Sequence, residues 1–177
     1  MDSEMFNFED IYDTYYRDVY HFALYYTNNR QEAEDITQET FIKVMKHLGS
    51  LNNPERLKTW IFSIVKNTAI DLKRKQKFVH YLPDWIYEKA SDEKTPEAQT
   101  IQKNEWSELQ EALLKLKPQF RTVMILRGLK DLTIKETAEI MGCSETKVRV
   151  DYHRALQQMK KNVHSYEERW GLKSEQS

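Results

Sequence analysis

Glycine and proline, the residues that most often interrupt helices, are rare in this sequence. Its 177 residues include only four of each, while helix formers such as Leu, Lys, Glu, Gln and Ala are abundant. Apolar residues recur at helical spacing, and no alternation of apolar and polar residues flanked by turn residues indicates a strand. Hydrophobic residues make up 40% of the chain, which is enough to fill the core of one domain or of two small ones. The sequence therefore predicts an all-α fold.

The helical pattern divides the chain into two parts. It runs from Phe6 to about Lys77 and is lost over residues 78–104, where prolines and charged residues are typical of a linker. We therefore predict a helical domain over residues 1–77, a flexible linker over 78–104 and a second helical domain over 105–177. Breaks within the first domain are expected at Asn28-Asn29 and over residues 49–54. The linker aromatics, which either dock on a surface or cover the flank of a domain, are Tyr81, Trp85 and Tyr87.

Several function classes are excluded by what the sequence lacks. Its apolar runs fall short of the roughly 18 residues that span a bilayer, and its acidic start does not resemble a signal peptide, so we expect a cytoplasmic protein. The single Cys143 permits no internal disulfide and is expected to pack rather than to act as a redox switch. There is no carboxylate pair, nucleophile constellation or phosphate-binding glycine loop, so we expect no enzyme, no cofactor and no small-molecule substrate. No metal site is expected either, because ligand spacing is absent among His21, His47, His80, His153 and His164.

Charge is strongly segregated along the chain, although the net charge is only −1. Residues 1–40 carry ten acidic and two basic side chains, whereas residues 41–77 carry two acidic and nine basic ones. Residues 78–117 are acidic again, with eight acidic and five basic side chains, and residues 118–161 are basic, with nine basic and five acidic side chains. Two basic islands suit a polyanion binder with two footprints, and a solvated, lysine-rich surface is the alternative.

A helix-turn-helix pattern lies in the second half of the chain. Thr133 and Glu136 fit a capping box that begins a helix, and Gly142 suits the left-handed residue that ends one. Ser144 can then cap a second helix. We predict a helix-turn-helix over residues 133–161. The residues expected to be buried in its first helix are Ile134, Ala138 and Met141.

The second helix of this pattern has an apolar stripe and a basic, polar outer face. Side chains near the N-terminus of such a helix reach base edges in the major groove, while Arg and Lys further along bind phosphates. The base-edge candidates are Lys147, Arg149 and Val150. A helical hairpin with a solvated basic face is the alternative. The stripe contains Val148, Tyr152, Ala155, Leu156, Met159 and Val163, and the outer face contains Thr146, Lys147, Arg149, Val150, His153 and Arg154.

The helix predicted over residues 33–48 also has two faces. Acids and an amide around an exposed isoleucine suit a basic groove on a protein partner, although a plain solvated face is the simpler interpretation. The side expected to be buried contains Thr37, Phe41, Val44, Met45 and Leu48. The opposite side contains Asp35, Gln38, Glu39, Ile42 and Lys46.

The next predicted helix, over residues 57–75, places Trp60 among cations. Aromatic rings stack on unpaired bases while Lys and Arg follow the backbone of single-stranded nucleic acid, and a core position for Trp60 is the alternative. The loop over residues 47–54, which precedes this helix, is suited to hold a base that is turned out of the stack of DNA bases. The side expected to be buried contains Leu57, Ile61, Ile64, Thr68 and Leu72. The other side contains Trp60, Ser63, Lys66, Asn67, Ile70 and Arg74.

Three segments resemble signature regions of a known family. The segment Ala33-Glu34-Asp35-Ile36-Thr37-Gln38-Glu39-Thr40-Phe41 resembles region 2.2 of extracytoplasmic-function sigma factors, the small two-domain group of bacterial RNA polymerase sigma factors. Residues 59–71 are similar to regions 2.3 and 2.4, and the helix-turn-helix resembles region 4.2. The resemblance covers nearly the whole chain in the family's order.

The resemblance implies a promoter-recognition subunit with three interfaces. Its partners would be the β and β′ subunits of core RNA polymerase, promoter DNA and an inhibitory anti-sigma factor, usually one linked to a membrane. The polymerase-binding residues would be Asp35, Gln38, Glu39 and Ile42. The residues that bind the melted non-template strand at the minus-10 element would be Ser50, Leu51, Asn52, Asn53, Trp60, Lys66, Asn67, Arg74 and Lys75. The residues that read the minus-35 element as duplex would be Ser144, Thr146, Lys147, Arg149, Val150, His153 and Arg154.

The sequence departs from the family at two positions of the second helix of the helix-turn-helix. Where many members have Gly and a second Arg, this chain has Thr146 and Asp151. An acid that faces DNA repels phosphate but can accept a hydrogen bond from a cytosine amino group, so the promoter sequence does not follow. The rival hypotheses are a free-standing helix-turn-helix regulator that binds operators as a dimer and an enzyme that acts on nucleic acid.

Overall fold

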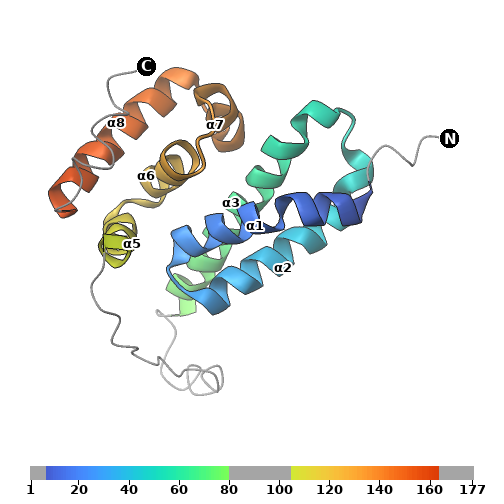
Figure 1. Cartoon of the computed structure of the whole chain (residues 1–177), viewed down its shortest axis with the longest axis horizontal. Helices are drawn as coiled ribbons and strands as arrows, with labels where there is room; N and C mark the ends of the chain where they lie inside the picture. Colours follow the sequence, from blue (N-terminus) through green and yellow to red (C-terminus); the bar gives the residue numbers. More distant parts are fainter. Residues whose placement is uncertain (1–6, 80–104, 164–177) are drawn as a thin grey trace.

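The computed structural model of the chain describes residues 7–79 and 105–163, and every regular element in these ranges is helical (Figure 1). The predicted all-α fold is therefore confirmed. The linker aromatics Tyr81, Trp85 and Tyr87 lie outside the described residues. No helix in the described ranges combines the length and the apolar character that a membrane span needs.

The first unit consists of α1 (Phe8–Thr27), α2 (Arg30–His47) and α3 (Leu57–Val79). The break between α1 and α2 falls at the predicted Asn28-Asn29, because each asparagine has a conformational role there. Asn28 adopts a left-handed conformation with φ of 53°, which ends α1. The side chain of Asn29 accepts a hydrogen bond from the Glu32 amide at 3.0 Å and so caps α2.

The second break, between α2 and α3, is a loop with two short 3₁₀ turns. These are η1 (Leu48–Ser50) and η2 (Pro54–Arg56), and Pro54 at the first position of η2 has no amide hydrogen that would need a partner. The Asn53 side chain accepts a hydrogen bond from the Glu55 amide at 2.9 Å. The loop thus ends in a capped turn that leads directly into α3.

The core of the first unit is wider than either predicted stripe because α2 and α3 each pack on more than one helix. Met45, predicted to be buried, is 57% exposed, and Ile36 and Thr40 are buried instead. The buried side of α3 also differs from the predicted one. Its buried residues are Thr59, Ile61, Phe62, Val65, Thr68 and Ala69, while Leu57, Ile64 and Leu72 are half-buried.

The second unit consists of α5 (Glu105–Lys115), α6 (Pro118–Val123), the π-helical segment η3 (Met124–Leu129), α7 (Ile134–Met141) and α8 (Glu145–Asn162). The side chains that form its core come from all of these elements. In α7, Ala138 and Ile140 are buried, whereas Ile134 and Met141, both predicted to be buried, are half-buried. In α5, Leu109 and Leu113 are buried, as is Leu116 just after the helix, whereas Trp106 is 38% exposed.

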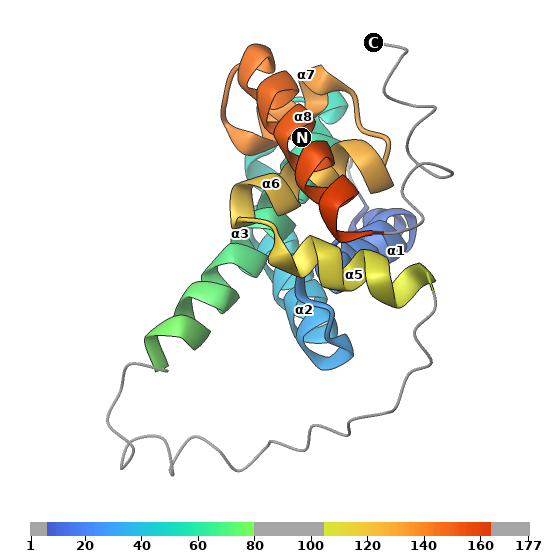
Figure 2. The same cartoon turned by 90° about the vertical axis from the view of Figure 1, so that its left-hand side faces the viewer.

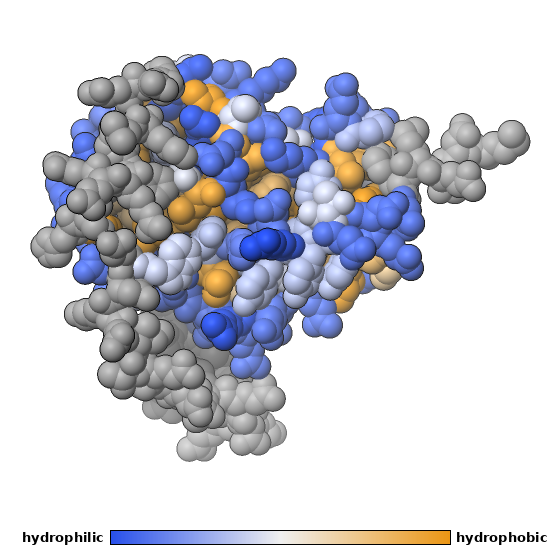
Figure 3. All heavy atoms as spheres, viewed as in Figure 1, coloured by the Kyte–Doolittle hydropathy of each residue, from blue (hydrophilic) through white to orange (hydrophobic). Residues whose placement is uncertain are grey.

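The two units lie against each other. In Figures 1 and 2, α7 lies beside α3, and α8 lies on the side of α7 that faces away from the first unit. On the α1 side, the Arg121 guanidinium donates to the Tyr26 carbonyl oxygen at 3.1 Å and covers the Tyr26 ring at 5.1 Å. The rings of Tyr25 and Trp106 meet edge to face at 5.3 Å. The face seen in Figure 3 is largely hydrophilic, with small hydrophobic areas separated by polar residues.

Candidate functional site

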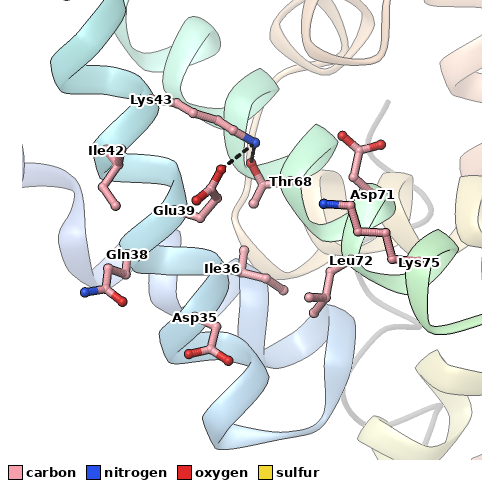
Figure 4. Close-up of a pocket in the computed structure, with 10 residues that line it drawn as sticks. All are labelled: Asp35, Ile36, Gln38, Glu39, Ile42, Lys43, Thr68, Asp71, Leu72 and Lys75. Atoms are coloured by element: carbon pink, nitrogen blue, oxygen red, sulfur yellow. Dashed lines mark hydrogen bonds and ion pairs between the residues drawn. The ribbon is translucent and has the colours of Figure 1, made fainter. Parts of the chain in front are cut away.

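The candidate polymerase-binding residues lie together on the exposed side of α2. Asp35, Gln38, Glu39 and Ile42 border a groove of about 380 Å³ between α2 and α3 (Figure 4). All four are exposed, and they combine acidic, amide and apolar groups over about two turns of one helix. Such a mixed face suits a protein partner with basic and apolar groups.

The Lys43 side chain connects the two helices that border this groove. The Lys43 ammonium lies 3.4 Å from the Glu39 carboxylate and donates to the Thr68 hydroxyl of α3 at 3.1 Å. Figure 4 shows Lys43 reaching between the two helices to make both contacts. The Glu39 side chain is therefore held in place while half of it remains exposed. Lys75, predicted to bind DNA, lines this groove from the α3 side.

An aromatic surface beside the α2 face was missed at the level of sequence. Tyr12 and Tyr16 of α1 are each 39% exposed, and the Tyr12 ring lies 4.7 Å from that of Phe41. With Met45 these rings line a second groove, of about 570 Å³, which shares Asp35, Gln38 and Ile42 with the first. The available signal was the spacing of Phe8, Tyr12, Tyr16 and Tyr20, because aromatic residues four apart stack along one side of a helix.

The loop candidates for nucleic-acid binding sit at the surface. Ser50, Asn52 and Asn53 are exposed, and Leu51 is half-buried. The Ser50 hydroxyl donates to the His47 carbonyl oxygen at 2.7 Å, which tightens the turn after α2. Two of the four residues therefore have a local structural role, since the Asn53 side chain caps η2.

The α3 candidates fall into two groups. Asn67, Arg74 and Lys75 are exposed. Trp60 is half-buried against the hydrophobic core. Its position is thus intermediate between the core position and the exposed, base-stacking position that the sequence left open. Lys66 is half-buried too, and its ammonium donates to the Ile140 carbonyl oxygen of α7 at 2.9 Å. Burial lowers the pKa of Lys66 from its ordinary value.

The helix-turn-helix has the predicted caps. The Thr133 hydroxyl accepts from the Glu136 amide at 3.1 Å, and a Glu136 carboxylate oxygen accepts from the Thr133 amide at 2.8 Å, which completes the capping box. Gly142 ends α7 with φ of 63°, where a residue with a Cβ is disfavoured. The Ser144 hydroxyl accepts from the Lys147 amide at 3.2 Å and caps α8. Ser144 is thus a capping residue as well as a candidate DNA contact.

The outer face of α8 is exposed at every position that the sequence predicted. Lys147 and Arg149 each form an ion pair with an acid on the same helix, Asp151 at 2.8 Å and Glu145 at 3.3 Å. Val150 is 42% exposed and so adds an apolar side chain to this polar face. The exposed residues of this face are Thr146, Lys147, Arg149, Val150, His153 and Arg154.

Asp151 does not face solvent as its position beside this surface suggested. It is only 2% exposed, and its carboxylate accepts hydrogen bonds from the side chains of Gln119 and Lys147. The interpretation of Asp151 as an acid that faces DNA is therefore wrong. Because α8 packs on α6, the buried side of α8 extends to position 151. Gln119, at the start of α6, donates a hydrogen bond to the buried Asp151 carboxylate.

Comparisons with known proteins place this geometry in a family. Residues 11–79 match the model "Sigma-70 region 2", and residues 106–159 match "Sigma-70, region 4". The chain is 32% identical over 161 residues to the ECF RNA polymerase sigma factor SigX of Bacillus subtilis, covering 88% of this chain and 83% of that protein. It is 35% identical over 144 residues to the RNA polymerase sigma factor SigV of the same species, covering 81% and 83%.

Solved structures share the fold at lower identity. The sigma factor RpoE from Bartonella quintana, in complex with the anti-sigma factor NepR, is similar with a TM-score of 0.68 and 21% identity, over 87% of this chain and 94% of that one. CnrH, in complex with the cytosolic domain of CnrY, is similar with a TM-score of 0.65 and 19% identity, over 87% and 85%.

Sigma-70 regions 2 and 4, in this order on one short chain, define a transcription initiation factor. The chain belongs to the extracytoplasmic-function group of the sigma-70 family of RNA polymerase sigma factors. Its function is to direct RNA polymerase to promoters, and a free-standing helix-turn-helix regulator is not favoured.

Proposed function

We propose that this chain binds core RNA polymerase through the exposed face of α2 and grips a promoter at two places. The loop before α3 and α3 itself bind the melted non-template strand of the minus-10 element, and the outer face of α8 reads the minus-35 element as duplex. The observation that carries the proposal is that α2 and α8 each present a face that no other described helix covers. Interfaces with separate partners require such free faces.

The chemistry of each face supports its assignment. Asp35, Gln38, Glu39 and Ile42 offer acceptors around an apolar centre, which suits the β′ subunit of a polymerase better than it suits a polyanion. The α8 face offers cations, a hydroxyl and an apolar side chain, which suits base edges and phosphates in a major groove. The polymerase supplies the catalysis, so the chain itself has no enzymatic activity and no small-molecule substrate.

Two weak grips on one promoter are sufficient in this mechanism. When the polymerase holds both units at the right separation, binding of the first element raises the effective concentration of the second. The free chain should therefore bind promoter DNA weakly. Sequence-specific footprinting by the isolated chain at nanomolar concentration would contradict this division of labour.

The setting of this function follows the family. We propose that the chain acts in the cytoplasm and is held inactive by an anti-sigma factor, which is often linked to a membrane. Support comes from the similar fold of the sigma factor RpoE, which was solved in complex with the anti-sigma factor NepR, and from that of CnrH, which was solved in complex with the cytosolic domain of CnrY. An anti-sigma factor that inhibits this chain should compete with core polymerase for it.

Run-off transcription tests the proposed function directly. Purified core polymerase is supplied with or without the full chain on a library of randomised promoter templates, and the transcripts are sequenced. We expect a set of start sites that depends on the chain and shares upstream elements at two positions. Identical start sites and rates in both reactions would refute the proposal. The double variant Arg149→Ala/Arg154→Ala is the matched control, because it should lose the upstream element while its α2 face is unchanged.

A further inference from the structure

The two valines of α8 have opposite environments. Val148 is 1% exposed and belongs to the hydrophobic core, whereas Val150, two residues further along the helix, is 42% exposed. Among the described residues of α8, Val150 is the one large apolar side chain that is exposed. Packing within the chain therefore does not account for an apolar residue at position 150.

The location of Val150 matters more than its exposure, because isolated apolar side chains are common on protein surfaces. Val150 lies in the second turn of α8. The exposed residues three or four positions away, which share its side of the helix, are Thr146, His153 and Arg154. In a helix that enters a major groove, the first turns are the part that contacts base edges. Val150 is thus at the level of the helix where the proposed function requires contacts to bases.

Val150 differs from the two cations beside it in having no partner to give up. The Lys147 ammonium donates at 2.8 Å to the Asp151 carboxylate, which is only 2% exposed, so this cation is anchored toward the buried side of α8. Arg149 lies 3.3 Å from Glu145 in an exposed ion pair, which is weak and exchangeable. The branched Cβ of a valine in a helix strongly favours one rotamer, so the two methyl groups of Val150 have a preferred position.

Only one group on the edge of a base pair is complementary to this side chain. In the major groove, the bases present hydrogen-bond donors and acceptors and a single kind of methyl group, the C5 methyl of thymine. A base carbonyl or amino group that is covered by valine loses its hydrogen bond to water and gains none. Contact between the valine and a thymine methyl instead removes apolar surface from water, which is favourable.

We propose that Val150 is a specificity-determining residue that contacts the C5 methyl of one thymine in the minus-35 duplex. The inference deepens the proposed function and rests on it, because it takes the outer face of α8 as the surface that reads this duplex. Arg149 and Val150 then divide the recognition between them: Arg149 forms hydrogen bonds to a base edge, and Val150 selects a T·A pair through apolar contact.

Replacement of thymine by uracil tests the inference, because the two bases differ only in this methyl group. Core polymerase with the full chain transcribes templates in which each thymine of the selected upstream element, on either strand, is replaced in turn. At one position we expect the unmodified chain to transcribe the thymine template about three- to fivefold better than the uracil template. Val150→Ala should transcribe the two equally, and Val150→Ile, which keeps a branched apolar side chain, should retain the preference.

The matched control is Leu114→Ala, which removes an apolar side chain of similar exposure, 38%, from α5 and should leave the preference unchanged. Alanine is a good helix former, so Val150→Ala should fold, and circular dichroism checks this. A purely structural role of Val150 would lower transcription from both templates alike. That result would overturn the inference, as would a thymine preference that Val150→Ala retains.

The same reactions separate this inference from the proposed function. If transcription depends on the chain but no thymine of the element can be distinguished from uracil, only the role of Val150 is refuted. If transcription never depends on the chain, the proposed function fails, and the role of Val150 fails with it.

Discussion

The two candidate nucleic-acid surfaces of this chain differ in how the free molecule presents them. The outer face of α8 is exposed and lies away from the first unit, whereas α3 lies against α7 (Figures 1 and 2). The cations at this contact are Arg56, in the turn before α3, and Lys58 and Lys66 of α3. Both surfaces are rich in cations. The difference shows that Lys and Arg side chains can be free to bind a partner in one unit and bound to acids of the same chain in the other.

The ion pairs of the two surfaces show why. On α8, Lys147 and Arg149 pair with acids four residues away on the same helix, and such pairs leave the cations at the surface. At the start of α3, Lys58 and the preceding Arg56 of η2 pair with acids of α7. A local pair costs little to exchange for a phosphate, but a pair between units requires the units to move. The candidate duplex-binding surface on α8 is therefore exposed, whereas cations of the candidate strand-binding region contact α7.

The largest expected effect concerns the α2 face, which α7 does not cover. The double variant Gln38→Ala/Glu39→Ala should weaken binding to core polymerase by about 100-fold, because a few central residues carry most of the binding energy of an interface. Association is measured with labelled chain and purified core polymerase. The control Asp13→Ala/Gln31→Ala removes one acid and one amide from exposed positions on α1 and early α2 and should bind normally. Normal binding of the first variant would show that the polymerase uses another face.

The next effect tests Asp151 as a support behind the α8 surface. Asp151→Ala removes a buried acceptor of Gln119 and Lys147, so the free energy of unfolding should fall by about 2 kcal/mol. Urea denaturation followed by circular dichroism measures it. Preference among minus-35 sequences should be unchanged, because the carboxylate is buried. A shift in that preference without loss of stability would restore Asp151 as a contact to DNA.

A smaller effect is expected at the exposed surface of the same helix. Arg149→Ala should lower discrimination between the preferred minus-35 duplex and a mutated one by about tenfold, since one good contact to a base edge is worth roughly 1–3 kcal/mol. Transcription by the reconstituted holoenzyme from both templates gives the ratio. The exposed Lys160→Ala, further along α8, is the comparison and should weaken both templates alike. Equal losses for Arg149→Ala would assign it to phosphate instead of a base.

Sequence reasoning reached the local features and missed those that depend on long-range packing. The breaks at Asn28-Asn29 and the caps at Thr133, Gly142 and Ser144 were predictable because each depends on residues within a few positions. The burial of Asp151 was not, because its partner Gln119 lies 32 residues away on another helix.

The contacts of α3 were missed for the same reason. Periodicity assigns one buried stripe to a helix, but α3 packs on α1, α2 and α7, and the third contact is made by polar side chains. Charge counting marked residues 41–77 as a basic island but could not show that three of its cations have partners in the second unit. Polar contacts between units leave no periodic signal in a sequence.

The smallest effect, a response to pH, sharpens the comparison between the two surfaces. Burial opposes ionisation of Glu136, yet the Thr133 amide and Lys58 outweigh it, so the pKa of Glu136 lies below its ordinary value. The pKa of Glu139 is lowered as well. The largest cause is the hydrogen bond from Arg56, followed by the one from Thr59, and the positive charge of Lys135 adds a smaller effect. A lowered carboxyl pKa means that the α3–α7 contact is favoured above the ordinary carboxyl pKa and is lost as the pH falls through the lowered values.

Scattering measurements can follow this response in the free chain. From about pH 6 to pH 3, a range that includes the lowered pKa values, the radius of gyration should rise for the unmodified chain by a few per cent. The Glu136→Gln/Glu139→Gln variant, which has no carboxylate to protonate at either position, should already be expanded at the higher pH. Duplex binding through α8 should lack this dependence on the two carboxylates, because neither acid touches that face. If the Gln variant expanded as much as the unmodified chain over this range, other carboxylates would control the contact between the two units. The α3 surface would then differ from the α8 surface for a reason other than these two ion pairs.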